Sequence, residues 1–286
     1  MRLAVTGSSG TLGRATVDRL RADGHDVLGL DLAGPQGSDF TRVDLTDYGQ
    51  ALDALLGVTA RHTGLDALVH LAAIPVNGLV PDATTFHTNM TVSFNVFHAA
   101  LRAGITTIVY ASSITALGFP FDEPPAYLPL DEASEPRANN TYGLVKVLEE
   151  AMAAQLVRWR PELSMRALRF TNVTGPGEYR PFAERGHDPT YRRVLLWSYV
   201  DARDAAAAVA LALGAARPGF RAYNIAASDT GLTIPSADLV AAAFPDVPLR
   251  KRLGTHETLM SIDKARAELG YEPVHLWRAE LGLPPN

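Results

Sequence analysis

The sequence predicts an α/β fold: a doubly wound parallel sheet with a small C-terminal region that caps a substrate site. Three observations predict it. Short apolar runs alternate with helical stretches along the first part of the chain, which is typical of a parallel sheet covered by helices. The strand runs are continuously apolar, so both of their faces are expected to be buried. A glycine-rich segment, Thr6–Gly13, joins the first strand to the first helix.

The first four strands are expected where β-rich, apolar runs occur. They are Arg2–Thr6, His25–Asp31, Asp66–Leu71 and Thr106–Ala111. Helices are expected between them, because the intervening residues are periodic or rich in helix formers. These helices are Leu12–Ala22, Tyr48–Arg61 and Thr84–Ala103.

The second half continues the alternation and then changes character. A long helix, Thr141–Arg160, is stopped by Pro161 and leads into a strand at Leu163–Phe170. Glycine and proline become dense from Gly175 to Pro189, which predicts irregular structure over a site. The later elements are expected to be the strands Trp197–Val200 and Arg221–Ile225 and the helices Asp201–Ala215 and Ile262–Leu269.

The bulk properties narrow the functional class. The 286 residues are 47% hydrophobic and 20% charged, as in an ordinary soluble globular protein. A net charge of -5 and a pI near 5.9 disfavour a nucleic-acid partner. The absence of cysteine excludes disulfides and thiolate chemistry and fits a reducing cytoplasm. We expect a cytoplasmic protein, because the first strand leaves no room for a signal peptide and no apolar run has membrane-spanning length.

A Tyr and a Lys at helical spacing are the main candidates for chemistry. Tyr142 and Lys146 lie four residues apart, on one face of the predicted helix. An ammonium beside a phenol favours phenolate and lowers the phenol's pKa. Such a Tyr can exchange a proton with a substrate hydroxyl near neutral pH. Together with the glycine segment, the pair indicates alcohol–carbonyl redox chemistry with a nicotinamide cofactor.

The glycine segment offers a seat for a dinucleotide. Gly7, Gly10 and Gly13 follow a strand and open a helix, so a pyrophosphate can approach the N–H groups of the first turn, which includes Thr11 and Leu12. Asp31 ends the second strand, 18 residues after Gly13. A carboxylate there accepts hydrogen bonds from a ribose and repels a 2′-phosphate, which favours NAD over NADP. The alternative is a strand-end Asp that caps a turn.

Two further segments are expected to border the cofactor. Asp44 and Leu45 follow the next short segment, where they would lie beside the adenine; alternatively, Asp44 caps the following helix. Leu71, Ala72 and Ala73 end the third strand. Small residues there would let the cofactor lie across the strand ends, although plain packing explains them as well.

These residues together resemble the extended short-chain dehydrogenase/reductase family, the NAD-dependent epimerase/dehydratase group. The resemblance covers most of the chain. Its motifs are Thr6–Gly13, His70–Ala73, Tyr110–Ser113, Pro136–Lys146, Arg169–Pro176, Tyr199–Asp201 and Lys264–Tyr271. It implies a Rossmann-type NAD-binding core over residues 1–170 and a substrate-binding portion over residues 171–286, with segments that return to the core.

The resemblance also implies the roles of the site residues. Tyr142 is the acid/base, and Lys146 lowers its pKa and holds the nicotinamide ribose. Ser113 would hydrogen-bond the reacting oxygen. Ser112 is an alternative occupant of that position, and Thr115 would touch substrate.

Two Asn residues take roles from the same resemblance. Asn89 resembles the helix Asn that supports the active site, with a merely buried polar residue as the alternative. Asn172 resembles a substrate-facing Asn, with a turn-capping role as the alternative.

Departures from the family pattern point to the reaction. Ile114-Thr115 stands where sugar-nucleotide 4,6-dehydratases place Asp-Glu, so water elimination is disfavoured. The missing cysteine excludes epimerase-reductases that use a Cys/His pair. Leu117-Gly118 replaces the Tyr-Gly of galactose-type 4-epimerases. The segment between Gly177 and Trp197 is short for one that grips a nucleoside diphosphate, which favours a smaller substrate.

One arginine suggests a subgroup. Glu178-Tyr179-Arg180 resembles, more loosely, uronate dehydrogenases, which carry an Arg for the substrate carboxylate at a comparable place. Arg180 can form a bidentate pair with a carboxylate. The alternative is an exposed loop arginine.

The expected function is therefore an NAD-dependent oxidoreductase. It would interconvert a secondary alcohol and a carbonyl on a small sugar, sugar acid or polyol. An NAD-retaining nucleotide-sugar 4-epimerase, a carbonyl reductase and a non-enzymatic NAD-sensing protein remain alternatives. The histidines show no metal-ligand spacing, so no metal is expected. A homodimer through the helices Thr84–Ala103 and Thr141–Arg160 is expected, with a monomer as the alternative.

Overall fold

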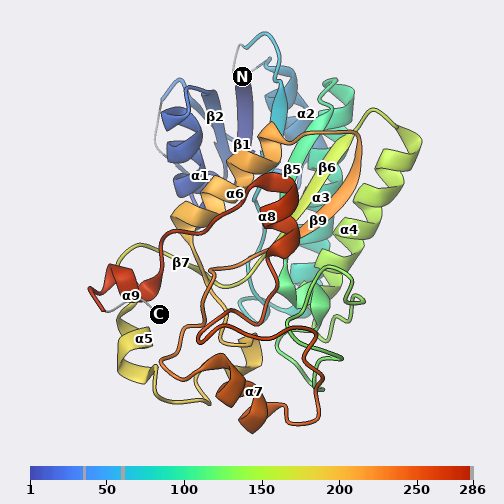
Figure 1. The fold of residues 1–286 in the computed structure, drawn as a ribbon. Helices are drawn as coiled ribbons and strands as arrows, with labels where there is room; N and C mark the ends of the chain where they lie inside the picture. Colours follow the sequence, from blue (N-terminus) through green and yellow to red (C-terminus); the bar gives the residue numbers. More distant parts are fainter. Residues whose placement is uncertain (35–36, 59–61, 284–286) are drawn as a thin grey trace.

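A parallel sheet forms the centre of the computed structural model, which describes residues 1–34, 37–58 and 62–283. The strand order is β3-β2-β1-β4-β5-β6-β9, and every neighbouring pair is parallel. The bounds are β1 Arg2–Thr6, β2 Asp26–Asp31, β3 Phe40–Arg42, β4 Ala67–His70, β5 Thr107–Ser113, β6 Ser164–Phe170 and β9 Gly219–Ile225. The chain winds from β1 to one edge and then from β4 to the other, which confirms the predicted doubly wound fold (Figure 1).

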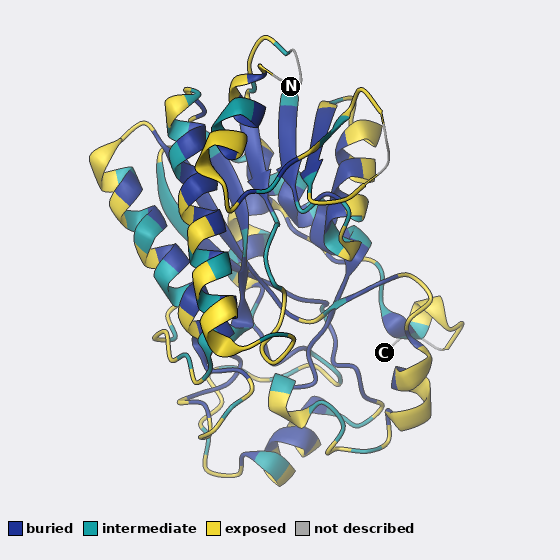
Figure 2. Ribbon diagram, turned by 180° about the vertical axis from the view of Figure 1, so that it is seen from behind, coloured by how far each residue is buried: buried dark blue, intermediate teal, exposed yellow. Residues whose placement is uncertain are grey.

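Helices cover both faces of this sheet. The helices α1 (Thr11–Ala22) and α6 (Ala202–Gly214) pack together on one face; α2 (Tyr48–Leu56), α3 (Asp82–Arg102) and α4 (Thr141–Trp159) cover the other (Figure 1). Successive strand side chains enter opposite cores. The strands are accordingly buried along both faces, whereas the outer sides of the helices are exposed (Figure 2).

Local signals fix the ends of two of these helices. Asn140 precedes α4, and its side chain accepts a hydrogen bond from the Gly143 N–H at 2.9 Å. Helix α2 ends at Leu56 because Gly57 adopts the left-handed conformation, with φ 83°. The prediction that α2 reaches Arg61 was too long at residues 57 and 58, and its last residues lie outside the described part of the chain.

The second half contains short elements that the sequence did not predict. The stretch expected to be irregular includes α5 (Arg180–Arg185) and is followed by the 3-10 turn Arg193–Leu195. The strand expected from Trp197 begins only at Val200, because Leu196 and Trp197 have positive φ values of 50° and 54°. This strand, β8 (Val200–Asp201), pairs with β7 (Val173–Thr174) in a separate sheet.

The C-terminal residues form a region beyond the carboxyl ends of the strands. Its helices are α7 (Ser236–Ala243), α8 (Asp263–Leu269) and α9 (Trp277–Glu280), and only α8 was predicted. Helices α5, α7 and α9 lie below the sheet, whereas α8 packs near β9 (Figure 1). Buried aromatic rings join the parts of this region, and the Tyr199 hydroxyl donates to Asp229 at 2.6 Å and accepts from the Trp277 N–H at 3.0 Å.

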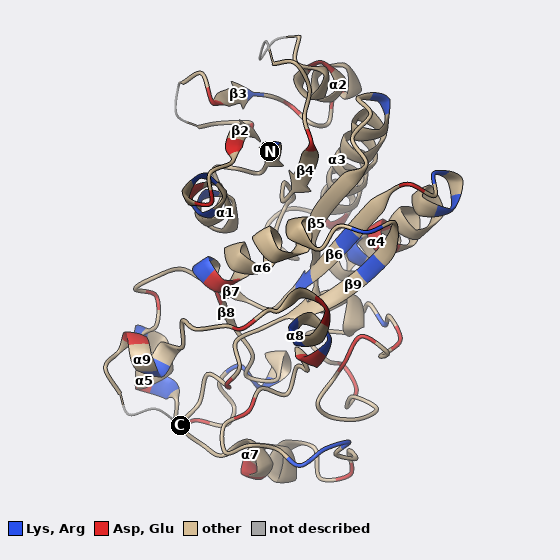
Figure 3. Ribbon diagram, turned by 45° about the horizontal axis from the view of Figure 1, so that its top comes forward, with Lys and Arg blue, Asp and Glu red and all other residues tan. Residues whose placement is uncertain are grey.

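The surface charge is mixed. Lys and Arg positions are interspersed with Asp and Glu positions on α1, α5, α8 and α9 (Figure 3). Among the described residues, no helix is long and apolar enough to cross a membrane.

Candidate active site

A cavity of about 910 Å³ opens at the carboxyl ends of the central strands. It lies where the strand order reverses, between β1 and β4, which is the usual ligand site of open α/β sheets. All but one of the residues predicted for the site line it. They are Gly7, Gly10, Thr11, Leu12, Gly13, Asp31, Asp44, Leu45, Leu71, Ala72, Ala73, Asn89, Ser112, Ser113, Thr115, Tyr142, Lys146 and Asn172.

The three glycines of the turn have different neighbours. Gly7 has φ +68°, and a Cβ on it would lie 2.7 Å from the Ala72 nitrogen. A Cβ on Gly13 would lie 2.0 Å from the Gly7 oxygen. Around Gly10, by contrast, a Cβ would meet described atoms only at 3.4 Å, from the same oxygen. The first and third glycines therefore permit the turn and its packing, and the second keeps a space open that fits an approaching pyrophosphate.

The helix N-terminus beside this space is uncapped. In the part of the chain that the structure describes, no side chain hydrogen-bonds the first turn of α1. The N–H groups at the start of a helix have no intrahelical partner and favour anions. The turn and the helix start together form a cradle that suits a dinucleotide phosphate.

Two carboxylates lie along the wall at the β2 and β3 strand ends. Asp31 accepts hydrogen bonds from the Ser9 N–H at 2.9 Å and the Leu32 N–H at 2.7 Å, so it ties the glycine turn to the end of β2. A carboxylate has further lone pairs for a ribose hydroxyl, and the two roles are compatible. Asp44 accepts from the Thr46 N–H and hydroxyl. The alternative that Asp44 caps α2 is wrong, because Asp47 does so.

The end of β4 is held by side chains behind it. The Thr6 hydroxyl accepts from the N–H groups of Leu71 at 3.2 Å and Ala72 at 3.3 Å. The buried Asn89 amide hydrogen-bonds the backbone of Ile74 twice, accepting from its N–H at 2.8 Å and donating to its C=O at 3.1 Å. Asn89 thus shapes the wall through the backbone of the segment after β4.

Ser113, Tyr142 and Lys146 meet at the opposite end of the cavity. Ser113 ends β5 and hydrogen-bonds Tyr142, whereas the Lys146 ammonium lies 5.5 Å from the centre of the Tyr142 ring. Burial raises the pKa of Tyr142 above its usual value, and Lys146 and the Ser113 hydrogen bond oppose that rise. The pKa of Tyr142 was expected to be lowered because only its neighbour Lys146 was taken into account. The structure adds burial and a nearby carboxylate, Glu149, both of which raise the pKa of Tyr142.

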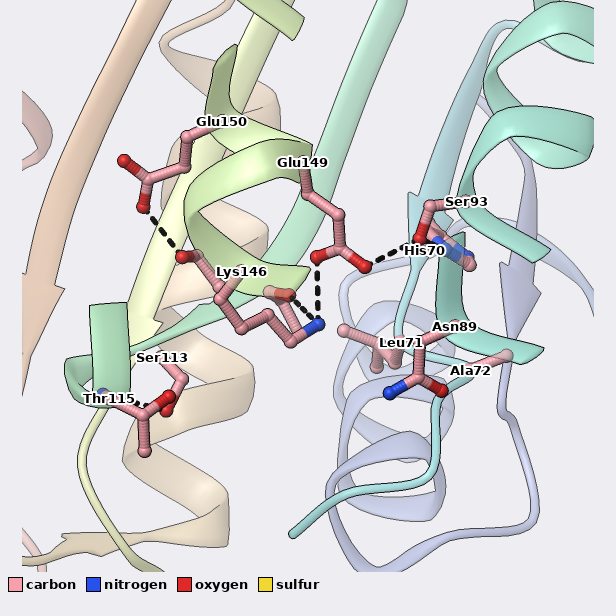
Figure 4. Close-up of polar contacts among 12 residues, drawn as sticks. His70, Leu71, Ala72, Asn89, Ser93, Ser113, Thr115, Lys146, Glu149 and Glu150 are labelled. Atoms are coloured by element: carbon pink, nitrogen blue, oxygen red, sulfur yellow. Dashed lines mark hydrogen bonds and ion pairs between the residues drawn. The ribbon is translucent and has the colours of Figure 1, made fainter. Parts of the chain in front are cut away.

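Lys146 is fixed by two buried partners. Its Nζ donates to the Ala111 carbonyl at 2.9 Å and to Glu149 Oε2 at 2.8 Å (Figure 4). Burial by itself lowers the pKa of Lys146, but Glu149, with Tyr142 and Glu150, outweighs it, and the pKa lies above the usual value. Glu149 was not among the residues predicted from the sequence. The available signal was its position three residues after Lys146, on the same helix face.

Ser112 faces away from Ser113, as neighbours in a strand do. Its hydroxyl donates to Glu150 Oε1 at 2.6 Å, and Glu150 forms a bidentate pair with Arg169 at 2.9 and 2.7 Å. The hydroxyl of Ser112 is therefore engaged by Glu150, and its contact with substrate stays a prediction.

The remaining predicted substrate residues separate into two kinds. The Thr115 hydroxyl is buried without a partner among the described residues, and exposed Asn172 lines the cavity beyond β6. Arg180 does not line the cavity; its side chain is 85% exposed and pairs with Glu184 at 2.6 Å. The first turn of α5 directs Arg180 to solvent, so the structure does not bring it to the cavity as the sequence had suggested, and its pairing with a substrate carboxylate stays a prediction.

The cavity lining carries few charges. Among the described residues, its charged members are Asp31, Asp44 and Lys146. Uncharged members of the lining were also not predicted from the sequence: Val76, Asn77, Pro120, Asn140, Phe170 and Leu195. In the described ranges, His, Asp and Glu form no group of three or more that could hold a metal ion.

The chain is similar in sequence to a known protein family and to individual proteins of known activity. Residues 3–226 match the model of the NAD dependent epimerase/dehydratase family. The chain is 34% identical over 163 residues to the L-arabinose 1-dehydrogenase (NAD(P)(+)) of Haloferax volcanii, covering 53% of this chain and 59% of that protein. It is 32% identical over 205 residues to the UDP-glucose 4-epimerase of Mycolicibacterium smegmatis, covering 68% and 63%. Both matches span less than two thirds of the relative's own length.

Solved structures share the fold over nearly the whole chain. A crystal structure of a UDP-galactose 4-epimerase aligns with a TM-score of 0.69 and 25% identity, covering 98% of this chain and 96% of that one. A short-chain dehydrogenase/reductase superfamily protein from Agrobacterium tumefaciens, with bound NAD, aligns with a TM-score of 0.71 and 24% identity, covering 99% and 95%.

Proposed function

The chain belongs to the NAD dependent epimerase/dehydratase family of extended short-chain dehydrogenases/reductases, and we propose that within it the protein is an NAD-dependent dehydrogenase for a secondary alcohol on a small neutral sugar or polyol. One observation carries the proposal. Ser113, Tyr142 and Lys146 open onto a cavity in which, among the described residues, Lys146 is the only cation. A phosphorylated or carboxylated substrate would find no free positive partner there.

The glycine turn supports the choice of cofactor. A nicotinamide dinucleotide held there would supply the hydride acceptor. The open space at Gly10 and the uncapped start of α1 suit its phosphates, and the Asp31 carboxylate would repel a 2′-phosphate. NAD is therefore favoured over NADP.

The catalytic residues would divide the proton transfer between them. Ser113 is placed to donate a hydrogen bond to the reacting oxygen, and Tyr142 would take the proton of the substrate hydroxyl. Lys146 would favour the phenolate form of Tyr142. Because burial raises the pKa of Tyr142, oxidation should speed up as the pH rises toward that pKa. Reduction of the carbonyl is the same path in reverse.

The substrate would be held by neutral polar groups. The buried Thr115 hydroxyl has no partner in the described part of the chain, and a substrate hydroxyl would satisfy it. Asn172 offers an amide at the rim of the same end. We assign the substrate-binding portion to residues 171–286 and the cofactor-binding core to residues 1–170, with Thr115 contributed by the core.

A nucleotide-sugar 4-epimerase is the second candidate. It is favoured by relatives named UDP-glucose 4-epimerase, including the one from Corynebacterium glutamicum, which is 24% identical over 96% of this chain. A diphosphate normally recruits Arg or Lys. Lys146 is already paired with Glu149, and Arg192 turns to the Ser198 carbonyl at 2.6 Å instead of lining the cavity. These contacts favour the dehydrogenase.

The experiment is a substrate panel. Purified protein is incubated with NAD and free aldoses, uronates or polyols, with NADP in parallel, and reduced nicotinamide is measured by absorbance. Turnover with NAD on neutral sugars or polyols is expected. Epimerisation of a UDP-sugar by protein that retains NAD, with no net reduction of it, would replace the proposal with the second candidate.

A substitution tests the assigned base. Tyr142→Phe removes the group that takes the proton, and we expect kcat to fall by about 100- to 10,000-fold. The affinity for NAD, measured by calorimetry, should change little, because the ring and Lys146 remain. Retained turnover in this variant would remove Tyr142 from the proposed role.

A further inference from the structure

Glu149 is a buried carboxylate that the proposed proton transfer does not use. Its side chain is 2% exposed, and its Oε2 lies 2.8 Å from Lys146 Nζ. Its other oxygen accepts a hydrogen bond from the Ser93 hydroxyl of α3 at 2.6 Å (Figure 4). Both oxygens of this carboxylate are thus committed, one to the ammonium beside Tyr142 and one to the neighbouring helix.

The contacts continue from Ser93 into the sheet. Ser93 Oγ lies 3.3 Å from His70 Nε2, and His70 Nδ1 lies 2.7 Å from the hydroxyl of Thr6, the residue before Gly7. Ser93 donates to Glu149, so it accepts from His70 Nε2–H, and Nδ1 then accepts from Thr6. One neutral tautomer of His70, with its proton on Nε2, therefore satisfies all of these hydrogen bonds from Thr6 to Glu149. Burial, with the nearby Lys146, lowers the pKa of His70 to about 3, which keeps the ring neutral.

The charged groups that face Tyr142 belong to one ion pair, Lys146–Glu149. From β5, Tyr110 stays uncharged, because burial and Glu150 raise its pKa well above the usual value. From α4 and β6, Glu150 and Arg169 neutralise each other. His70 on β4 and Ser93 on α3 are neutral. The phenol of Tyr142 therefore faces the Lys146–Glu149 pair rather than an isolated ammonium.

We propose that Glu149 is a positioning residue for the Tyr142–Lys146 pair: its carboxylate clamps the Lys146 ammonium against the Ala111 carbonyl and offsets the ammonium's charge at the Tyr142 hydroxyl. Lys146 has three N–H donors, and two of them are held. The third is left in a fixed direction. The inference goes beyond the proposed function and rests on it only for its kinetic readout.

Neutralising Glu149 has a defined consequence. The pair Tyr142–Lys146 loses its first proton more easily once no carboxylate faces it, whichever of the two groups releases that proton. A charge that lies as close as Glu149 does to Lys146, 2.8 Å, shifts a pKa by about 1 to 3 units. In Glu149→Gln the first proton should therefore leave at a pH lower by about one unit or more.

A titration tests this without a substrate. The absorbance of tyrosinate is followed with pH in the wild type and in Tyr142→Phe, and their difference isolates Tyr142. The same difference is measured in the Glu149→Gln background. The expected result is the downward shift, with a smaller one in Glu149→Asp, which keeps the charge but shortens its reach. No shift in either variant overturns the proposal, and Glu149→Asp serves should Glu149→Gln fail to fold.

Kinetics supply the second readout. In Glu149→Gln, the rising limb of the pH profile of kcat should move to lower pH by the amount seen in the titration, and KM for NAD should rise because Lys146 is no longer fixed. A purely structural role would lower the Tm and leave the limb in place. Glu184→Gln, which removes an exposed partner of Arg180, is the control and should change neither. Absence of turnover on every substrate would refute the proposed function, yet the titration would still decide the role of Glu149.

Discussion

At the residue scale, two glycines of the turn are expected to be needed for different reasons: Gly13 for packing and Gly10 for binding the cofactor. Gly13→Ala would place a methyl group 2.0 Å from a backbone oxygen, so we expect it to destabilise the fold by about 1 to 3 kcal/mol or more. Gly10→Ala meets only an ordinary contact at 3.4 Å, with an allowed φ of -72°. Its stability should stay within about 0.5 kcal/mol of wild type, while its affinity for NAD falls because the methyl group occupies the phosphate's approach.

Urea unfolding and NAD titration of the two variants measure these effects. The expected pattern is a stable Gly10→Ala that binds NAD poorly and an unstable Gly13→Ala. Wild-type NAD affinity in Gly10→Ala would contradict the assignment of the open space at Gly10 to the pyrophosphate.

Individual site residues were predictable where a motif fixes the backbone. The glycine turn, Ser113, Tyr142 and Lys146 follow from chain order, and the fold brings them to one cavity. The direction in which a side chain points was harder to predict from the sequence. Arg180 and Ser112 lie at or near the expected positions, but the one turns to solvent and the other to Glu150. The pKa of Tyr142 also depends on burial, which no local pattern reports.

At the element scale, helix α4 is tied to the sheet by a buried ion pair. Glu150 pairs with Arg169 of β6 and accepts from Ser112 of β5, so one carboxylate joins three elements. Arg169→Met would leave this carboxylate buried without its cation, and we expect the free energy of unfolding to fall by about 3 to 5 kcal/mol.

Denaturant unfolding measures that loss, and a second variant tests its cause. Arg169→Met combined with Glu150→Met should recover part of the stability, because no unpaired charge remains. The exposed pair Arg160–Glu162 is a matched control, and Glu162→Gln should cause no measurable change. A double variant less stable than Arg169→Met would show that packing, rather than the unpaired charge, carries the effect.

The elements that could be predicted are those with a long, regular pattern. The central strands and the helices α1, α3, α4 and α6 were expected from apolar runs and periodicity. The missed ones, such as β3 and α9, span three and four residues, too few to show a period. The start of β8 was misplaced because Leu196 and Trp197 take left-handed conformations that only their buried tertiary contacts can enforce.

At the scale of the whole molecule, residues from both parts of the chain line the cavity. The core supplies the glycine turn and the catalytic residues, and the strand ends beyond β6 supply Asn172 and Val173. The lining does not include α7 or α9. Substrate selection by this chain should therefore depend on the loops at the strand ends more than on the C-terminal helices.

The outer side of α3 and α4 leads to a prediction about assembly. These helices pack against each other, and Phe94 and Leu144 expose 49% and 44% of their surface. Burying such side chains against a second copy would remove apolar surface from water. We expect the chain to sediment as a dimer, with twice the mass of the 30.7 kDa chain.

Sedimentation of a charged variant tests the location of that contact. Phe94→Glu should shift the protein to a monomer that is still folded, because the side chain is half exposed in the single chain. Val274→Glu, at a 69% exposed position in the C-terminal region, should leave the dimer intact. The glycine turn and Asp31, which would hold NAD, lie in the cavity lining of this chain, so the Phe94→Glu monomer should keep its NAD affinity. A wild-type protein that sediments only at 30.7 kDa at micromolar concentration would refute the dimer, and a dimeric Phe94→Glu would place the contact elsewhere.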